Sequence, residues 1–164
     1  MHAFLRPAFV LLGALLAVPV LGADAPAAKT AFERLKSIEG EWKGDDSMKV
    51  VYKVTAAGSV VQETMFPGTP SEMVTMYHLD GDELRLTHYC ASGNQPRLKL
   101  DRKASSDDTL EFVFEGGTNL DPAKDMHMHS GRIWFKDAKH LESEWDGYAD
   151  GKKTGSHTFV LSKP

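Results

Sequence analysis

The chain has very little cysteine: Cys90 is the only one in 164 residues, so no disulfide can form within it. A fold held together by disulfides, as in many small exported domains, is thereby excluded. A zinc site of the Cys-x-x-Cys type is excluded as well. In an oxidising compartment a single cysteine is either a buried, inert thiol or a reactive one, and burial is the common state of free cysteines.

The sequence also lacks a strong excess of charge of either sign. The chain has 19 Lys and Arg residues and 23 Asp and Glu residues, which gives a formal net charge of −4. Acids and bases are interspersed, a pattern that is typical of a soluble protein and argues against a nucleic-acid partner. Internal repeats, linkers and a second domain are absent too, so one domain with a single core is expected.

Long apolar runs are absent except at the N-terminus. Arg6 supplies a positive charge, residues 8–21 are almost uninterruptedly apolar, and the small pair Gly22-Ala23 follows. This order is typical of a secretory signal peptide, and the run is too short and wrongly flanked for a membrane span. We predict that residues 1–23 are a signal peptide. The protein is then exported, to the periplasm or as a secreted protein, without a membrane partner after cleavage.

A short helix is expected at the start of the mature domain. Residues 24–29 form a flexible lead-in, and the domain covers residues 30–164. Thr30 and Glu33 fit a capping box, because Thr30 can cap the first turn while Glu33 reaches back to it. Apolar residues recur every third position in this segment and give one apolar stripe, formed by Phe32, Leu35 and Ile38.

After Gly40 the apolar residues alternate with period two, and turn residues interrupt them regularly. Asp80-Gly81-Asp82 and Asp150-Gly151 are hairpin signals between such runs. About nine or ten strands of roughly 6–10 residues, joined mainly by short turns, predict an all-β, antiparallel up-and-down barrel. The longest connection covers residues 116–125 and is either a lid at the barrel mouth or a plain crossover.

Gly40 and Trp42 form a motif that is found in a known protein family. A short N-terminal helix, a Gly-x-Trp motif opening the first strand and a meander of antiparallel strands resemble the lipocalin-like (calycin) barrels. The chain is also similar to uncharacterised exported bacterial proteins of that shape. The resemblance covers nearly the whole predicted domain and implies a helix plugging one barrel end, a tryptophan at the base, and small-ligand binding. A small closed barrel either fills with side chains or encloses one small ligand.

The densest group of polar side chains lies in residues 87–96. Strand alternation places His88 and Cys90 on the leucine-bearing face of their strand, which is the inward face. A polar group inside a small β protein must be hydrogen-bonded or bind something. With Asn94 and Gln95 from the following turn, these residues predict a site for a small, partly apolar molecule.

Three further positions belong to the predicted site. Glu63 is inward if it shares the face of its apolar neighbours, and then needs a polar partner; otherwise Gln62 takes its place. His129 and His157 share faces with apolar residues of their own strands. The complete set of predicted ligand-binding residues is His88, Cys90, Asn94, Gln95, Glu63, His129 and His157.

Binding is preferred over catalysis, but other functions stay open: a structural or interaction barrel with a filled core and no ligand, an enzyme, a haem protein or a copper protein. Cys90 beside His88 suggests a thiol or acid–base enzyme at the same mouth. One inward histidine, His157 or His88, would suffice as an axial haem ligand, and the nitrobindin-like branch of such barrels binds haem in this way. Met126, Met128 and Cys90 would suit copper(I), but a regular strand cannot point both methionines and the alternating histidines at one ion. We assign no catalytic residue, metal ligand or cofactor from the sequence.

Overall fold

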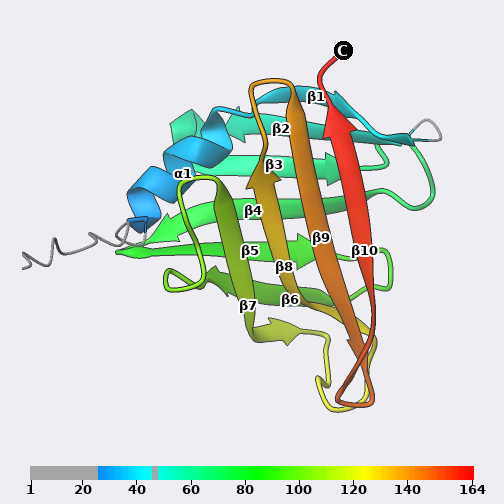
Figure 1. The fold of residues 1–164 in the computed structure, drawn as a ribbon. Helices are drawn as coiled ribbons and strands as arrows, with labels where there is room; N and C mark the ends of the chain where they lie inside the picture. The colour runs from blue at the N-terminus through cyan, green and yellow to red at the C-terminus, as the bar shows by residue number, and fades with distance from the viewer. Residues whose placement is uncertain (1–25, 46–47) are drawn as a thin grey trace, which may run out of the picture.

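The computed structural model describes residues 26–45 and 48–164, so the predicted signal peptide lies outside the described residues. Across these residues ten antiparallel strands form a closed barrel in which every strand pairs with its neighbours in the chain (Figure 1). The strands are β1 (Gly40–Lys43), β2 (Lys49–Thr55), β3 (Val60–Met65), β4 (Met73–Asp80), β5 (Glu83–Tyr89), β6 (Gln95–Leu100), β7 (Thr109–Thr118), β8 (His127–Phe135), β9 (His140–Ala149) and β10 (Lys152–Ser162). The predicted all-β up-and-down barrel with a short N-terminal helix is confirmed.

The helix α1 (Ala28–Lys36) starts earlier than the sequence predicts. Its N-cap is Ala27, which makes no side-chain capping bond, and the first helical bond runs from the Ala31 amide to the Ala27 carbonyl. The predicted capping box is therefore wrong: Thr30 lies inside the first turn, and Glu33 pairs with Lys36 at 2.9 Å. Alanine has the highest helix propensity, which explains the extension of α1 into the expected lead-in.

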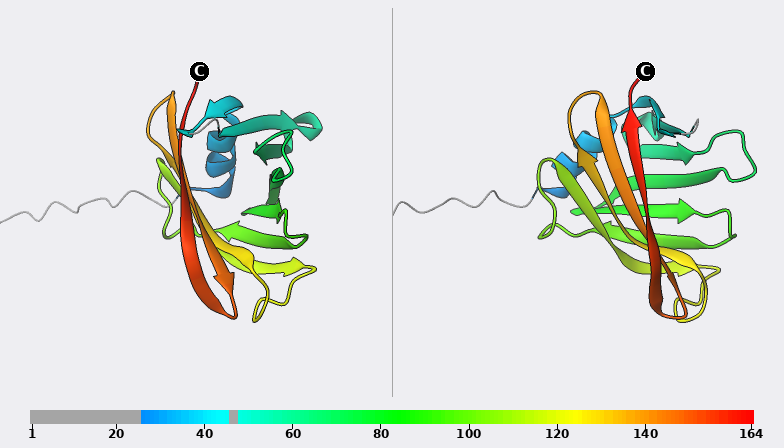
Figure 2. Two further views of the ribbon diagram at one scale, coloured as in Figure 1. Left: turned by 90° about the vertical axis from the view of Figure 1, so that its right-hand side faces the viewer. Right: turned by 45° about the vertical axis from the view of Figure 1, so that its right-hand side comes forward.

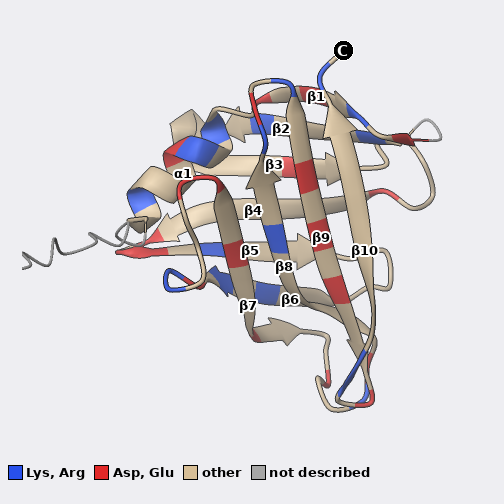
Figure 3. Ribbon diagram, viewed as in Figure 1, with Lys and Arg blue, Asp and Glu red and all other residues tan. Residues whose placement is uncertain are grey.

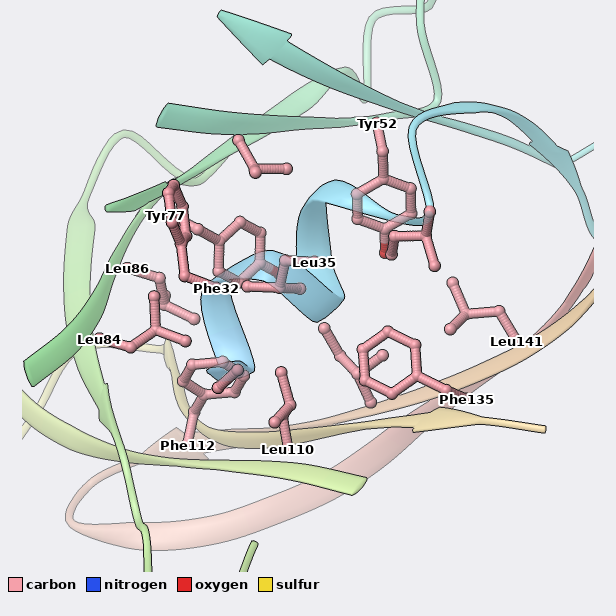
Figure 4. Packing of buried hydrophobic residues seen from close by; sticks show 14 of the residues in the cluster. Phe32, Leu35, Tyr52, Tyr77, Leu84, Leu86, Leu110, Phe112, Phe135 and Leu141 are labelled. Atoms are coloured by element: carbon pink, nitrogen blue, oxygen red, sulfur yellow. The ribbon is translucent and has the colours of Figure 1, made fainter. Parts of the chain in front are cut away.

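The helix α1 closes one end of the barrel and forms the centre of its core. Phe32 and Leu35 lie among inward side chains from opposite walls (Figure 4), and each is at least 97 % buried. Burial of each side chain contributes about 2 kcal/mol. Trp42 fixes the helix end from β1, since its indole Nε1 donates to the Ile38 carbonyl at 2.8 Å.

The barrel closes through a narrow contact. β1 and β10 pair only at Lys43 and Ser162 among the described residues, whereas β10 pairs with β9 along almost its whole length. The hairpin of β9 and β10 extends beyond the other strands (Figure 1), and the side views show β8–β10 as a wall facing β2–β6 (Figure 2). Residues 152–158 of β10 are consequently exposed.

The outer wall is polar. Acidic positions on β7 and β9 flank a basic position on β8 (Figure 3). Arg132 lies 3.0 Å from Glu144 and 3.7 Å from Glu111, so one guanidinium links three strands. Within the described part of the chain, none of the helices is long and apolar enough to span a membrane.

Candidate functional site

A recess of about 380 Å³ lies at the barrel end opposite α1. The ends of β3, β4 and β5 form one wall, and β8, β9 and β10 form the other. Most of its surface is apolar and comes from Met65, Phe66, Met73, Met126, Met128, Trp145 and Phe159. Its other lining residues are His88, Cys90, His127, Asp146, Gly147, Thr154 and His157. Neither Lys nor Arg is among the described residues that line it.

A second hollow of about 530 Å³ lies beside α1 at the opposite end. Its lining carries the exposed ion pair of Arg34 and Asp108, whose atoms lie 3.9 Å apart. Exposed ion pairs of this kind contribute little, although Arg34 Nε itself is buried without a partner among the described residues. We place the candidate site in the first recess, because its lining combines a mostly apolar surface with His88, Cys90 and His127.

Glu63 is a buried carboxyl group with only 1 % of its surface exposed, and no ion pair joins it to a cation in the part of the chain that the structure describes. The Tyr52 hydroxyl donates to Oε1 at 2.9 Å, and the Tyr77 hydroxyl donates to Oε2 at 2.6 Å. Burial raises the pKa of Glu63, while hydrogen bonds from Tyr77, Tyr52 and Thr75 oppose that rise. Of the two registers considered for β3, the one with Glu63 inward is thus correct, and Gln62 lies on the outer face.

His88 connects this buried carboxylate to the recess. Thr75 is the cross-strand neighbour of both Glu63 and His88, and its Oγ1 lies 2.9 Å from His88 Nδ1. Burial lowers the pKa of His88 to about 4, so the ring is neutral at pH 7. Its other nitrogen, Nε2, has no partner among the described residues and is not one of the sealed-off polar atoms. Nε2 therefore reaches the recess that His88 lines.

Trp145 forms part of the opposite wall, but its indole N–H is sealed off from solvent. The side chain is 6 % exposed, lines the recess, and its indole Nε1 is buried without a partner among the described residues. The ring lies flat on Gly131, where an added Cβ would stand 1.9 Å from a ring carbon. A glycine is therefore required on β8 for Trp145 to occupy this position on β9.

A β-bulge brings His127 and His129 together. The register of β8 against β9 shifts between Met128 and Ser130, and His127 Nε2 lies 3.0 Å from His129 Nδ1. His127 Nδ1 lies 2.8 Å from the Asp125 carbonyl, which can only accept, so Nδ1 carries a proton. In the neutral ring Nε2 then accepts from His129 Nδ1. Burial, followed by the neighbouring His127, lowers the pKa of His129.

The surroundings of His129 are aromatic. Its ring stacks on Tyr148 at a centroid distance of 3.9 Å and on Phe114 at 4.7 Å. His129 therefore lies beside the recess rather than in its lining, which His127 reaches instead. The alternation expected for His129 required the strand to run unbroken through Gly131, and the register shift just before this glycine breaks it.

The structure brings His88, Cys90 and His157 of the predicted set together around the recess. His157 was expected to be interior but is exposed, because β10 extends beyond the strands that would cover it. Cys90 is half-buried, and its Sγ accepts a hydrogen bond from Ser92 Oγ at 3.0 Å. Among the described residues no hydrogen bond joins Cys90 to a histidine, so the contact that an enzyme with a thiol–imidazole pair needs is not formed.

Asn94 and Gln95 lie outside the lining and brace the neighbouring loop. The Asn94 amide donates to the Met126 carbonyl at 2.7 Å, and Gln95 Oε1 accepts from Thr118 at 2.8 Å and Asn119 at 3.0 Å. Glu63 lies outside the lining as well, two strands from His88, with Thr75 in register between them. The sequence interpretation missed Thr75, although it shares the inward face of β4 with Tyr77.

Neither a metal-binding cluster nor a similarity to known proteins indicates the function. Within residues 26–45 and 48–164 no group of three or more His, Cys, Asp or Glu side chains is placed to hold a metal ion. No family model matches the chain, and a search of curated proteins also finds no match. The function is therefore argued from the recess alone.

Proposed function

We propose that the chain is an exported, lipocalin-like barrel that binds a small, partly apolar molecule in the recess opposite α1. The observation that carries the proposal is a mostly apolar recess on which His88 Nε2 opens without a partner among the described residues. A hydrogen bond between a ligand and this nitrogen would contribute about 0.5–1.5 kcal/mol. Apolar walls with a few convergent polar groups are typical of ligand sites.

The volume and composition of the recess support the same function. At about 380 Å³ it falls at the small end of the range for ligand pockets. Methionine side chains from four positions line it, and their flexible thioethers adapt to ligands of irregular shape. The lipocalin-like family assignment and the export of the protein belong to the same proposal, supported by the barrel, the N-terminal helix and the signal-peptide pattern.

Binding of a neutral fluorescent probe, N-phenyl-1-naphthylamine, tests the proposal. Thr154 is exposed and lines the recess, so Thr154→Trp should block it without disturbing the core. Val160 lies on the same strand, is 63 % exposed and lies outside the lining, which makes Val160→Trp the matched control. We expect saturable binding to the wild type and the control, and at least a tenfold weaker affinity for the blocked variant. Equal binding to all three, or none to the wild type, would contradict the proposal.

Native mass spectrometry of the protein purified from the exporting cell addresses the haem and copper alternatives. Met126, His127 and Met128 line one recess together with Cys90, and a regular strand would not place these three consecutive residues on one face. A bound organic molecule of low mass supports the proposal. A haem or copper adduct that disappears in the Thr154→Trp variant would replace it with the corresponding alternative.

A further inference from the structure

The strand β10 has a free edge along most of its length. On one side it pairs with β9 from Lys152 to Ser162, whereas on the other side it meets β1 only at Ser162 among the described residues. Residues 152–158 are also exposed, and the left view of Figure 2 shows β10 uncovered along the flank that faces the viewer. An open edge presents unpaired N–H and C=O groups with which another chain can pair.

The hydrogen-bond pattern shows which residues direct their backbone groups to the free edge. The Lys163 amide donates to the Lys139 carbonyl at 2.9 Å, next to the position where Ser162 pairs with β9. Ser162 therefore forms a non-hydrogen-bonded pair with β9, and such pairs alternate with hydrogen-bonded ones along the strand. Ser156 and Thr158 are of the same kind as Ser162, so their N–H and C=O groups point away from β9 to the open side.

The part of this edge that remains open among the described residues spans residues 155–159. Beyond it the edge is covered, because the Val160 carbonyl lies 3.3 Å from the position of an added Cβ on Gly44. At the other end, Lys153 and the register shift that follows it protect the edge, since lysines and bulges discourage pairing. Within residues 155–159 the register is regular, and neither Lys, Arg, Asp, Glu nor Pro occurs there.

We propose that residues 155–159 of two copies of this chain pair in antiparallel orientation and form a symmetric dimer. With His157 on the two-fold axis, Ser156 of each copy lies opposite Thr158 of the other copy. These are the residues whose backbone groups point to the open side, so each such pair exchanges both of its N–H···O bonds. A two-fold interface must be complementary to itself, and this register places no Lys, Arg, Asp or Glu opposite another.

The side chains on the inner face of β10 complement one another in the same register. Gly155 lies opposite Phe159 of the second copy in a non-hydrogen-bonded pair, where side chains approach most closely. An added Cβ on Gly155 would meet nothing within 4 Å, so there is space for the phenyl ring, and an aromatic side chain stabilises a glycine of an edge strand in this way. Because His157 and Phe159 line the recess, the dimer adds side chains of the second copy to its rim.

Sedimentation of the exported protein over a range of concentrations tests the dimer, which does not depend on ligand binding in the recess. The contact is short, so we expect a reversible equilibrium between monomer and dimer. Thr158→Pro removes an N–H that points to the open side and leaves the bonds to β9 intact, since proline is tolerated at such positions of an edge strand. It should weaken dimerisation at least about tenfold, whereas the control Thr158→Val keeps the N–H and should dimerise like the wild type.

A disulfide across the two-fold axis tests the register without the proline variant. In a Cys90→Ser background, His157→Cys brings two thiols to facing positions of a non-hydrogen-bonded pair, a spacing that a disulfide can bridge. We expect oxidation with diamide to link this variant into dimers. The matched control is Val160→Cys on the same strand, which is 63 % exposed. In the proposed register it lies about 20 Å from its copy and should stay unlinked.

Three results would overturn the proposal. The first is a wild type that stays monomeric up to about 1 mM and gives no cross-link at position 157, even if the edge accepts another polypeptide. The second is a Thr158→Pro variant that dimerises like the wild type, since the contact would then lie elsewhere. The third is a cross-link of Val160→Cys in preference to His157→Cys, because it requires another register. Each leaves ligand binding in place, which the fluorescent probe measures independently.

Discussion

His88 Nδ1 lies 2.9 Å from Thr75 Oγ1, and Thr75 stands directly opposite the buried Glu63 on the next strand. The pair joins neighbouring strands β4 and β5 in direct register. The hydrogen bond holds the ring in one orientation, so a group that lines a flexible, methionine-rich recess is itself rigid. Rigid polar groups in an adaptable apolar wall give a binding site its selectivity.

The pH dependence of stability should report the buried state of His88. Its pKa of about 4 in the folded chain lies below the ordinary value of 6.5, so between these values the unfolded chain binds more protons. Stability is therefore complete above about pH 6.5 and falls as the pH drops toward about 4, by about 3 kcal/mol in all. The measurement is the free energy of unfolding in urea, determined for the wild type and for His88→Gln at several pH values between about 4 and 7.

The difference in unfolding free energy between the wild type and His88→Gln reports the effect of His88 alone. His129 also has a lowered pKa and adds to the loss at low pH, whereas the raised pKa of Glu63 acts in the opposite direction. Both effects are present in the variant and cancel in the difference. A difference between wild type and His88→Gln that stays constant from pH 7 to pH 4 would show that His88 is not buried as a neutral ring.

Removal of the Tyr77 hydroxyl should destabilise the barrel. Tyr77→Phe leaves one oxygen of a buried carboxylate without its 2.6 Å donor, and we expect the free energy of unfolding to fall by about 1–3 kcal/mol. The loss should shrink in a Glu63→Gln background, because the two substitutions remove the same interaction. Tyr89→Phe, at a side chain 49 % exposed, is the control and should change stability by less than about 0.5 kcal/mol.

Gly131 should be essential for the recess. Gly131→Ala places a Cβ 1.9 Å from the Trp145 ring, so the ring must move, at a cost of about 1–3 kcal/mol in stability. Probe affinity should fall together with stability, since Trp145 lines the recess. Gly155→Ala on β10 is the matched control, because its added Cβ meets nothing within 4 Å. Unchanged Trp145 fluorescence and probe affinity in Gly131→Ala would count against the described wall.

Cys90 offers a direct measure of occupancy, because it is the only thiol in the chain and lines the recess. Bound N-phenyl-1-naphthylamine should slow the reaction of Cys90 with a maleimide several-fold. Conversely, the labelled protein should bind the probe more weakly. A Cys90→Ser variant should retain probe binding, since the thiol serves as a marker here. If saturating probe leaves the reaction rate of Cys90 with the maleimide unchanged, the probe binds elsewhere.

Alternation alone predicts most of the fold, since a strand facing a core must carry apolar residues at every second position. It also places His88, Cys90 and Glu63 on inward faces. It does not reveal that the β9–β10 hairpin extends past the barrel and exposes His157, because alternation defines the faces of one strand and not what covers them. The bulge that pairs His127 with His129 depends on cross-strand register, which a single strand does not encode.

The most direct test of ligand binding in the recess is the indole N–H signal of Trp145 during a titration with N-phenyl-1-naphthylamine, followed by ¹H–¹⁵N NMR. We predict that this signal moves most among the tryptophans, because the Trp145 side chain lines the recess and a bound aromatic ring would change its magnetic environment. The Trp42 signal, fixed by the Ile38 carbonyl, should stay in place. A titration that leaves Trp145 unmoved, or that moves Trp42 instead, would contradict the account.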